Sequence, residues 1–185
     1  MHIFVVTGRV HGGKTTFVGE LVEALKEKDL RVSGFLSRGT FRDGRRDSFF
    51  LEDLAEGTEI PLATLDPREG WFRYRRFYFN PIALEKGTEM VTGRSGLASD
   101  LIVVDEVGPL ELQGMGWYSL LREVAAMDTI PQVWVAGDRV VDDVMEKWGI
   151  APENVVRADT GIEHDAREEL LGLLMEKIVK FNPLH

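Results

Sequence analysis

Residues 8–16 read GRVHGGKTT and combine three glycines with a lysine and two threonines. Their spacing fits the pattern G-x-x-x-x-G-K-[ST], which runs from Gly8 to Thr15. In such a loop, glycines let backbone N–H groups turn inward around phosphate oxygens, where a Cβ would collide. The lysine reaches the outer phosphates, and the final hydroxyl ligates Mg²⁺. The motif therefore predicts a phosphate-binding loop in which Lys14 contacts phosphate and Thr15 contacts the metal.

The segments on either side of this loop fit that interpretation. The loop follows a short β-rich run, HIFVVTG (2–8), and a helical pattern from Lys14 to about Asp29 follows it. A helix that begins here offers unpaired N–H groups and the positive end of its dipole to an anion. The residues expected to surround the phosphates are Gly8, Arg9, Val10, His11, Gly12, Gly13, Lys14, Thr15 and Thr16.

Two adjacent acids end a second hydrophobic run, DLIVVDEV (100–107). A phosphate loop of this kind needs a carboxylate near its metal, and Asp105 ends the apolar stretch where that carboxylate is expected. We expect Asp105 to hold Mg²⁺ through water. Glu106 is expected to orient the water that attacks the terminal phosphate. Because adjacent residues of a regular strand point to opposite faces, the role of Glu106 depends on the local backbone.

Arginines supply further candidate groups. Arg9 lies inside the loop, Arg139 follows the predicted strand 132–137, and Arg122 lies on a predicted helix. Each is a candidate for stabilising charge in a transition state, and each is also typical of a solvated surface ion pair. The segment REGWFRYRRFYFN (68–80) alternates arginines with aromatic residues. We interpret it as an amphipathic hairpin with Phe72, Tyr74 and Tyr78 on one face, rather than as a single-stranded nucleic-acid site.

Strands alternating with helices must position these groups, and this alternation predicts a parallel α/β sheet. Strands are expected over 2–8, 31–37, 100–107, 132–137 and 153–159. Helices are expected over 14–29, 116–127, 139–148 and 163–181. Between them, residues 38–96 carry turn signals that separate short aromatic and aliphatic runs, which predicts an antiparallel β-rich insertion without helices.

Composition fits one domain over residues 1–185. The chain has no cysteine and no apolar run of membrane-spanning length, and its start shows no charged leader or cleavage site. We therefore expect no membrane partner and a cytoplasmic location. A net charge of −9 argues against broad binding to nucleic acid. Nothing in the sequence indicates a particular oligomeric state.

The loop GRVHGGKTT, the block VVDEVGPLEL (103–112) and the segment GFLSRGTFRDGRR (34–46) resemble the small P-loop nucleoside-triphosphatases of the cancer-related and thermophilic type. The resemblance implies a three-layer P-loop NTPase sandwich whose mostly parallel sheet carries the antiparallel insertion. It also implies Mg²⁺-dependent hydrolysis of ATP, GTP and other nucleoside triphosphates. Within Asp-Glu-x-Gly-x-x-Glu, it implies a catalytic role for Glu111 beside Lys14 and Glu106.

Three functions follow from these observations. The first is a Mg²⁺-dependent nucleoside-triphosphatase, with a nucleoside triphosphate as its partner. The second is a kinase for a nucleotide, nucleoside or other small molecule, in which the 38–96 insertion binds the acceptor and FRDGRRDSF (41–49) acts as a lid. The third is a nucleotide-binding switch or cofactor-assembly factor that hydrolyses slowly until a partner arrives.

Overall fold

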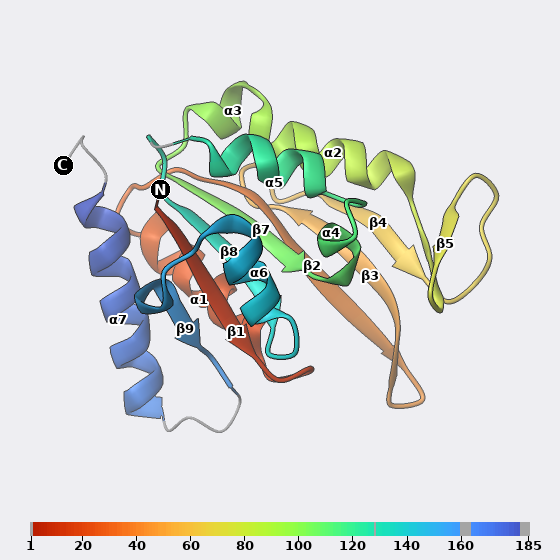
Figure 1. The fold of residues 1–185 in the computed structure, drawn as a ribbon, viewed down its shortest axis with the longest axis horizontal. Helices are drawn as coiled ribbons and strands as arrows, with labels where there is room; N and C mark the ends of the chain where they lie inside the picture. The colour runs from red at the N-terminus through yellow and green to blue at the C-terminus, as the bar shows by residue number, and fades with distance from the viewer. Residues whose placement is uncertain (1, 128, 160–163, 182–185) are drawn as a thin grey trace.

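A mixed sheet forms the centre of the protein. The structure is a computed structural model and describes residues 2–127, 129–159 and 164–181. Its strands are β1 (Ile3–Gly8), β2 (Val32–Arg42), β3 (Arg45–Asp53), β4 (Glu59–Thr64), β5 (Phe72–Tyr74), β6 (Phe77–Phe79), β7 (Leu101–Val107), β8 (Gln132–Gly137) and β9 (Val155–Arg157). Across the described residues the order is β5-β6-β4-β3-β2-β7-β8-β1-β9 (Figure 1).

The sheet has a parallel half and an antiparallel half. Strands β2, β7, β8, β1 and β9 pair in parallel, as the alternation of strands and helices predicted. Strands β3, β4, β6 and β5 extend the sheet from β2 by antiparallel pairing. The carboxyl ends of β1 and β7 lie at the same edge of the parallel half, which brings the phosphate loop near the acids of β7.

Helices cover both faces of the sheet. They are α1 (Lys14–Lys26), α2 (Pro81–Thr92), α3 (Arg94–Leu97), α4 (Pro109–Leu112), α5 (Tyr118–Ala125), α6 (Val141–Trp148) and α7 (His164–Lys180), with a 3₁₀ turn at Pro152–Asn154. Each helix predicted from the sequence is present, with ends that differ by a few residues. Residue 163, the expected start of the last helix, lies outside the described residues. No helix in the described part of the chain is both long and apolar enough to span a membrane.

Strand β1 divides its side chains between two apolar cores. Ile3 and Val5 pack into a cluster that includes residues of α2, α5 and α6, which lie in front of the sheet in Figure 1. Phe4 and Val6 pack into a second cluster with α1 and α7 on the other face. This alternation along one strand places a layer of helices on each side, and it confirms the three-layer α/β architecture.

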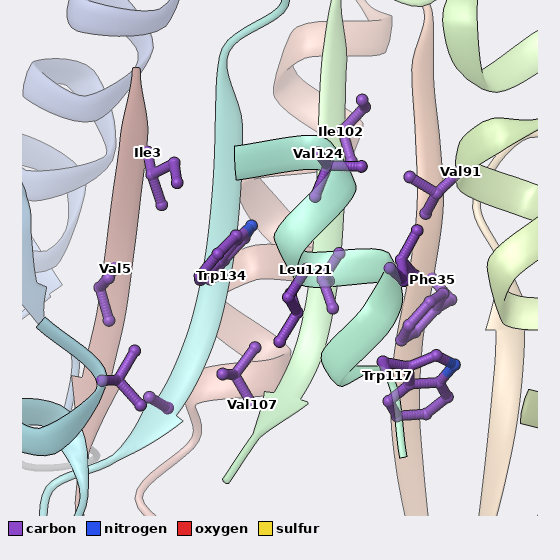
Figure 2. Close-up of a cluster of buried hydrophobic side chains, with 14 of the residues drawn as sticks. Ile3, Val5, Phe35, Val91, Ile102, Val107, Trp117, Leu121, Val124 and Trp134 are labelled. Carbon is purple, nitrogen blue, oxygen red and sulfur yellow. The ribbon is translucent and has the colours of Figure 1, made fainter. Parts of the chain in front are cut away.

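Aromatic contacts anchor the front helices to the sheet. Trp117 precedes α5 and packs against Phe35 of β2, with ring centroids 4.5 Å apart, as Figure 2 shows. Its indole N–H also donates to the Leu84 carbonyl of α2 at 3.2 Å. Leu121 and Val124 are buried on the same helix face, as predicted. These contacts fix the end of the segment that connects β7 to α5.

The prediction that 38–96 lacks helices is wrong for its last part. Residues 81–97 form α2 and α3 instead of strands. Asn80 caps α2 by accepting a hydrogen bond from the Ile82 N–H at 3.1 Å, and proline occupies the first helical position. The buried face carries Ala83, Gly87 and Val91, which recur every four residues. Ala83 and Gly87 add little apolar surface to this face, so the sequence shows no apolar stripe at this helix.

The 68–80 segment does form a hairpin, but its faces differ from the prediction. Strand β5 turns back at residues 75–76, which interrupts the alternation of a continuous strand. Tyr74 pairs with Phe77, and Phe72 pairs with Phe79, so these side chains share a face. Tyr78 pairs with Arg73 on the opposite face. The grouping of Tyr78 with Phe72 and Tyr74 was therefore wrong.

Candidate active site

The predicted phosphate loop connects β1 to α1 and bends sharply. The backbone is left-handed at His11, where φ is 62°, and at Gly13, where φ is 80°. The Gly12 N–H donates to the Arg9 carbonyl at 2.9 Å. The Lys14 ammonium folds back over the loop and donates to the carbonyls of Gly8 at 3.1 Å and Arg9 at 2.8 Å. The structure thus brings the predicted loop residues together around the N-terminus of α1.

A carboxylate that follows β9, the edge strand paired with β1, holds this loop. Asp159 follows β9, and its Oδ1 accepts a 2.6 Å hydrogen bond from the Arg9 N–H. That bond is the main reason that the pKa of Asp159 is lowered. A Cβ at Gly8 would lie 2.7 Å from the same oxygen, and one at Gly12 would lie 3.0 Å from it. Asp159 is a site residue that the sequence did not predict, since its only signal was an acid at the end of a short predicted strand.

The two predicted metal ligands meet across 90 residues of sequence. The Thr15 hydroxyl, in the first turn of α1, donates to Asp105 Oδ2 at the end of β7, and the two oxygens are 2.9 Å apart. The Ser37 N–H of β2 donates to the same oxygen at 3.0 Å. Asp105 is only 1% exposed. Three elements therefore converge on one buried carboxylate.

The Asp105 site suits a hard divalent cation. Burial, together with the neighbouring charge of Glu106, raises the pKa of Asp105 to about 7, and the hydrogen bonds that it accepts oppose this rise. A cation beside a buried carboxylate would favour its charged form. One carboxylate and one hydroxyl are few protein ligands, which fits Mg²⁺, an ion that draws its other ligands from phosphate and water. No cluster of three or more acids or histidines able to hold a metal occurs among the described residues.

Glu106 occupies an irregular point in β7. The register between β7 and β8 shifts between Val104 and Val107, and Glu106 has a left-handed backbone with φ of 69°. The simple alternation of faces therefore does not apply at this residue. Its side chain is about half exposed. Surrounding protein atoms nevertheless displace water from the carboxyl group and raise its pKa, and the charges of Arg46 and Lys14 oppose this rise. The irregularity thus places Glu106 near the lysine of the loop.

Arg46 of β3 is a site residue that sequence analysis did not single out. Its Nη1 lies 3.7 Å from Glu106 Oε1, and its guanidinium covers the ring of Phe49 at 4.9 Å. Its Nε is buried and has no hydrogen-bond partner in the described part of the chain. A Cβ at Gly39 would lie only 2.5 Å from that nitrogen. The only available signal was its place beside the Asp43-Gly44 turn, in the segment considered as a lid.

Cations gather around the loop from several elements. The pKa of His11 is lowered mainly by burial, and the charges of Arg46, Lys14 and Arg76 lower it further. Arg76 lies in the turn of the β5–β6 hairpin, so this hairpin reaches toward the phosphate loop. Of the arginines considered from the sequence, Arg122 instead lies over Tyr118 within α5.

Glu111 lies in α4, beyond the strand that carries the other acids. It is 2% exposed, and its two oxygens accept hydrogen bonds from the Gly108 N–H at 2.9 Å and the Trp117 N–H at 3.3 Å. Burial is the main reason that its pKa rises to about 7. The side chain thus ties together the two ends of the segment between β7 and α5, close to Glu106.

Comparisons with known proteins agree with this geometry. A family model described as NTPase matches residues 3–156. The nucleoside-triphosphatase THEP1 of Methanopyrus kandleri is 32% identical over 187 residues, with 97% of each chain covered. The corresponding protein of Archaeoglobus fulgidus is 40% identical over 108 residues, which cover 58% of this chain and 61% of that one.

Solved structures show the same fold. A human cancer-related nucleoside triphosphatase matches with a TM-score of 0.67 and 20% identity, and the match covers 94% of this chain and 96% of that one. THEP1 from Aquifex aeolicus matches with a TM-score of 0.68 and 22% identity, over 93% of this chain and 98% of that one. The family model matches most of the chain, and the structural matches cover nearly all of it. We conclude that this chain is an enzyme of the P-loop NTPase family, as the resemblance of its motifs predicted.

Proposed function

We propose that this chain is a Mg²⁺-dependent nucleoside-triphosphatase that hydrolyses ATP, GTP and other nucleoside triphosphates to the diphosphate and phosphate. The main support is the 2.9 Å contact between Thr15 Oγ1 and Asp105 Oδ2, which joins the phosphate loop to the acid-bearing strand. The relatives named as nucleoside-triphosphatases agree with this proposal. A cytoplasmic location is part of the proposal, because a chain without cysteine suits a reducing compartment.

In this proposal the loop binds the phosphates and the metal. The backbone N–H groups of residues 8–16 surround phosphate oxygens, and the Lys14 ammonium leaves its two carbonyl partners to contact the outer phosphates. Thr15 and Asp105, whose oxygens lie 2.9 Å apart, are the residues that would hold Mg²⁺. Bound Mg²⁺ supplies positive charge that neutralises the phosphate oxygens as the reaction proceeds.

Hydrolysis also needs a base and further positive charge. Glu106 accepts the proton of the attacking water, since its carboxylate lies beside the metal ligand and within the influence of Lys14. Arg46 stabilises negative charge on the terminal phosphate, because its guanidinium is held near Glu106 and its buried Nε lacks a partner in the described chain. Glu111 positions the 108–117 segment through its hydrogen bonds to the Gly108 and Trp117 N–H groups. Because the family resemblance implies a catalytic role for it, Glu111 is also the alternative to Glu106 as the base.

Phosphate release from ATP, GTP, CTP and UTP, with Mg²⁺ or with excess EDTA, tests the proposal. We expect release only with Mg²⁺. Glu106→Gln should keep triphosphate binding and lose turnover by about 10²–10⁴-fold, the usual contribution of a positioned base. Asp105→Asn should raise the Mg²⁺ concentration that half-saturates the rate. Glu85→Gln, at an exposed position of α2, is the matched control and should behave like the parent.

Two results would change the assignment. If Glu106→Gln hydrolyses at the parental rate while Glu111→Gln is inactive, Glu111 is the base. If EDTA leaves the release of phosphate unchanged, the metal role of Thr15 and Asp105 is wrong. Binding of a fluorescent triphosphate should be measured on each variant, so that a loss of binding is separated from a loss of chemistry.

A further inference from the structure

A small cavity lies beside the proposed base. Its volume is about 120 Å³, and its lining comes from β2, β3, β4, the β5–β6 hairpin and the segment after β7. Most of the wall is apolar, with Phe49, Leu62 and Phe79 from the antiparallel half of the sheet and Trp117 from the front layer. Glu106 also lines it, so the cavity borders the place where the proposed reaction occurs. None of the roles assigned above uses this space.

Two polar atoms at this cavity have no partner. The Ser37 hydroxyl and the Tyr74 hydroxyl are both buried, and neither makes a hydrogen bond within the described part of the chain. Ser37 is only 1% exposed, and its backbone N–H binds the Asp105 carboxylate. Leaving a buried hydroxyl unpaired is unfavourable, because it has lost its hydrogen bonds to water. The two hydroxyls therefore indicate a ligand that brings hydrogen-bonding atoms into a mostly apolar space.

Charge and size restrict this ligand. Glu106 and Arg75 both line the cavity, so it carries one acidic and one basic group and favours a neutral molecule. The carboxyl group of Glu111 also lines it, but both of its oxygens accept hydrogen bonds from backbone N–H groups. An apolar cavity of ~150 Å³ accepts benzene, so this somewhat smaller space suits a molecule of about six non-hydrogen atoms. A hydroxyl on an apolar body matches both the lining and the volume.

We propose that this cavity binds a small neutral alcohol whose hydroxyl replaces water as the acceptor of the terminal phosphoryl group. The proposal rests on the proposed function, because it uses the same triphosphate site and Glu106. The alcohol oxygen forms a bond to the γ-phosphorus, and the bond from that phosphorus to the β–γ bridging oxygen breaks. The hydroxyl proton passes to the Glu106 carboxylate, and the nucleoside diphosphate leaves with the bridging oxygen. The products are a phosphate monoester and the diphosphate.

The test measures binding and transfer separately on the full chain. Cyclopentanol and 1-pentanol are the probes, with methylcyclopentane and hexane as the matched molecules that lack the hydroxyl. Ligand-observed NMR without nucleotide measures binding, and we expect at least one alcohol to bind tenfold or more tightly than its hydrocarbon match. With ATP and Mg²⁺, ³¹P NMR should detect that alcohol's phosphate ester beside inorganic phosphate, and the two together should equal the diphosphate formed.

Variants locate the effect in this cavity. Tyr74→Phe removes one unpaired hydroxyl and should weaken binding of that alcohol about tenfold. Tyr78→Phe removes a hydroxyl from the opposite face of the same hairpin and should change neither alcohol binding nor phosphate release. Leu62→Phe fills part of the cavity from β4 and should also reduce the ester, which keeps the test decisive if Tyr74→Phe misfolds.

The outcomes separate this proposal from the nucleoside-triphosphatase proposal. If every alcohol binds no better than its hydrocarbon match, or binds without forming an ester, the acceptor role is wrong. In that case diphosphate matched one for one by inorganic phosphate would leave the hydrolase proposal intact. If no diphosphate forms from any triphosphate, the hydrolase proposal fails, whatever the binding data show.

Discussion

The buried carboxyl of Glu111 provides a sharp test of the site, through the pH dependence of stability. Burial raises its pKa from an ordinary 4.5 to about 7. The folded protein therefore keeps this proton up to about pH 7, whereas the unfolded chain releases it near pH 4.5. Between these values the folded state binds more protons, so the free energy of unfolding falls as the pH rises. At about 1.4 kcal/mol per pH unit, the loss is about 3 kcal/mol.

Glu111→Gln removes this proton while keeping one oxygen that can accept from the Gly108 N–H. From pH 5 to pH 8, we expect the stability of the variant to rise relative to the parent by about 2–3 kcal/mol. Urea unfolding followed by tryptophan fluorescence, in EDTA and without nucleotide, measures both proteins at each pH. The contribution of Asp105, whose pKa is also raised, is common to both proteins and largely cancels in this difference.

The control for this experiment is Glu85→Gln, which changes an exposed acid of α2 and should shift stability by less than about 0.5 kcal/mol at both pH values. Parallel curves for the parent and Glu111→Gln would refute the reasoning, because they would mean that Glu111 is ionised in the folded protein at neutral pH. A neutral Glu111 fits a positioning residue, whereas an ionised one would favour its role as the rival base.

Further predictions concern the loop and the sheet. Lys14→Ala should weaken triphosphate binding or turnover at least tenfold, which corresponds to about 1.4 kcal/mol. Titration with a triphosphate and phosphate release measure these two quantities, and unchanged values in a folded variant would show that the loop assignment is wrong. Asp159→Ala frees the Arg9 N–H and should weaken binding of a fluorescent triphosphate several-fold with little change in thermal stability. Gly34→Ala should destabilise the fold by more than about 4 kcal/mol in urea unfolding, because its Cβ would strike the Val103 carbonyl of β7 and φ is 95°. Gly172→Ala, at an open position of α7, should instead gain up to about 1 kcal/mol.

Local sequence was enough to predict the phosphate loop and the parallel half of the sheet. The spacing of Gly8, Lys14 and Thr15 follows from the geometry of one short loop. All three residues lie within eight positions of the chain, so a local pattern is enough to identify them. The apolar run before Asp105 is continuous and has the length typical of a buried strand. Helix α2 was missed because Ala83 and Gly87 bury a face that is too small to register as hydrophobic.

Tertiary structure decided which distant residues meet at the site. Arg46 lies in β3 and Asp159 follows β9, both outside the loop in sequence, and no local pattern distinguishes them from surface charges. The pKa of Glu111 depends on burial, and burial depends on how several elements pack around one side chain. The sequence by itself determined the chemistry of the loop and of the strand-end acids, because that chemistry is local. The neighbours of these groups, their exposure and the cavity beside Glu106 were decided only when the sheet assembled, since each depends on contacts between segments far apart in the chain.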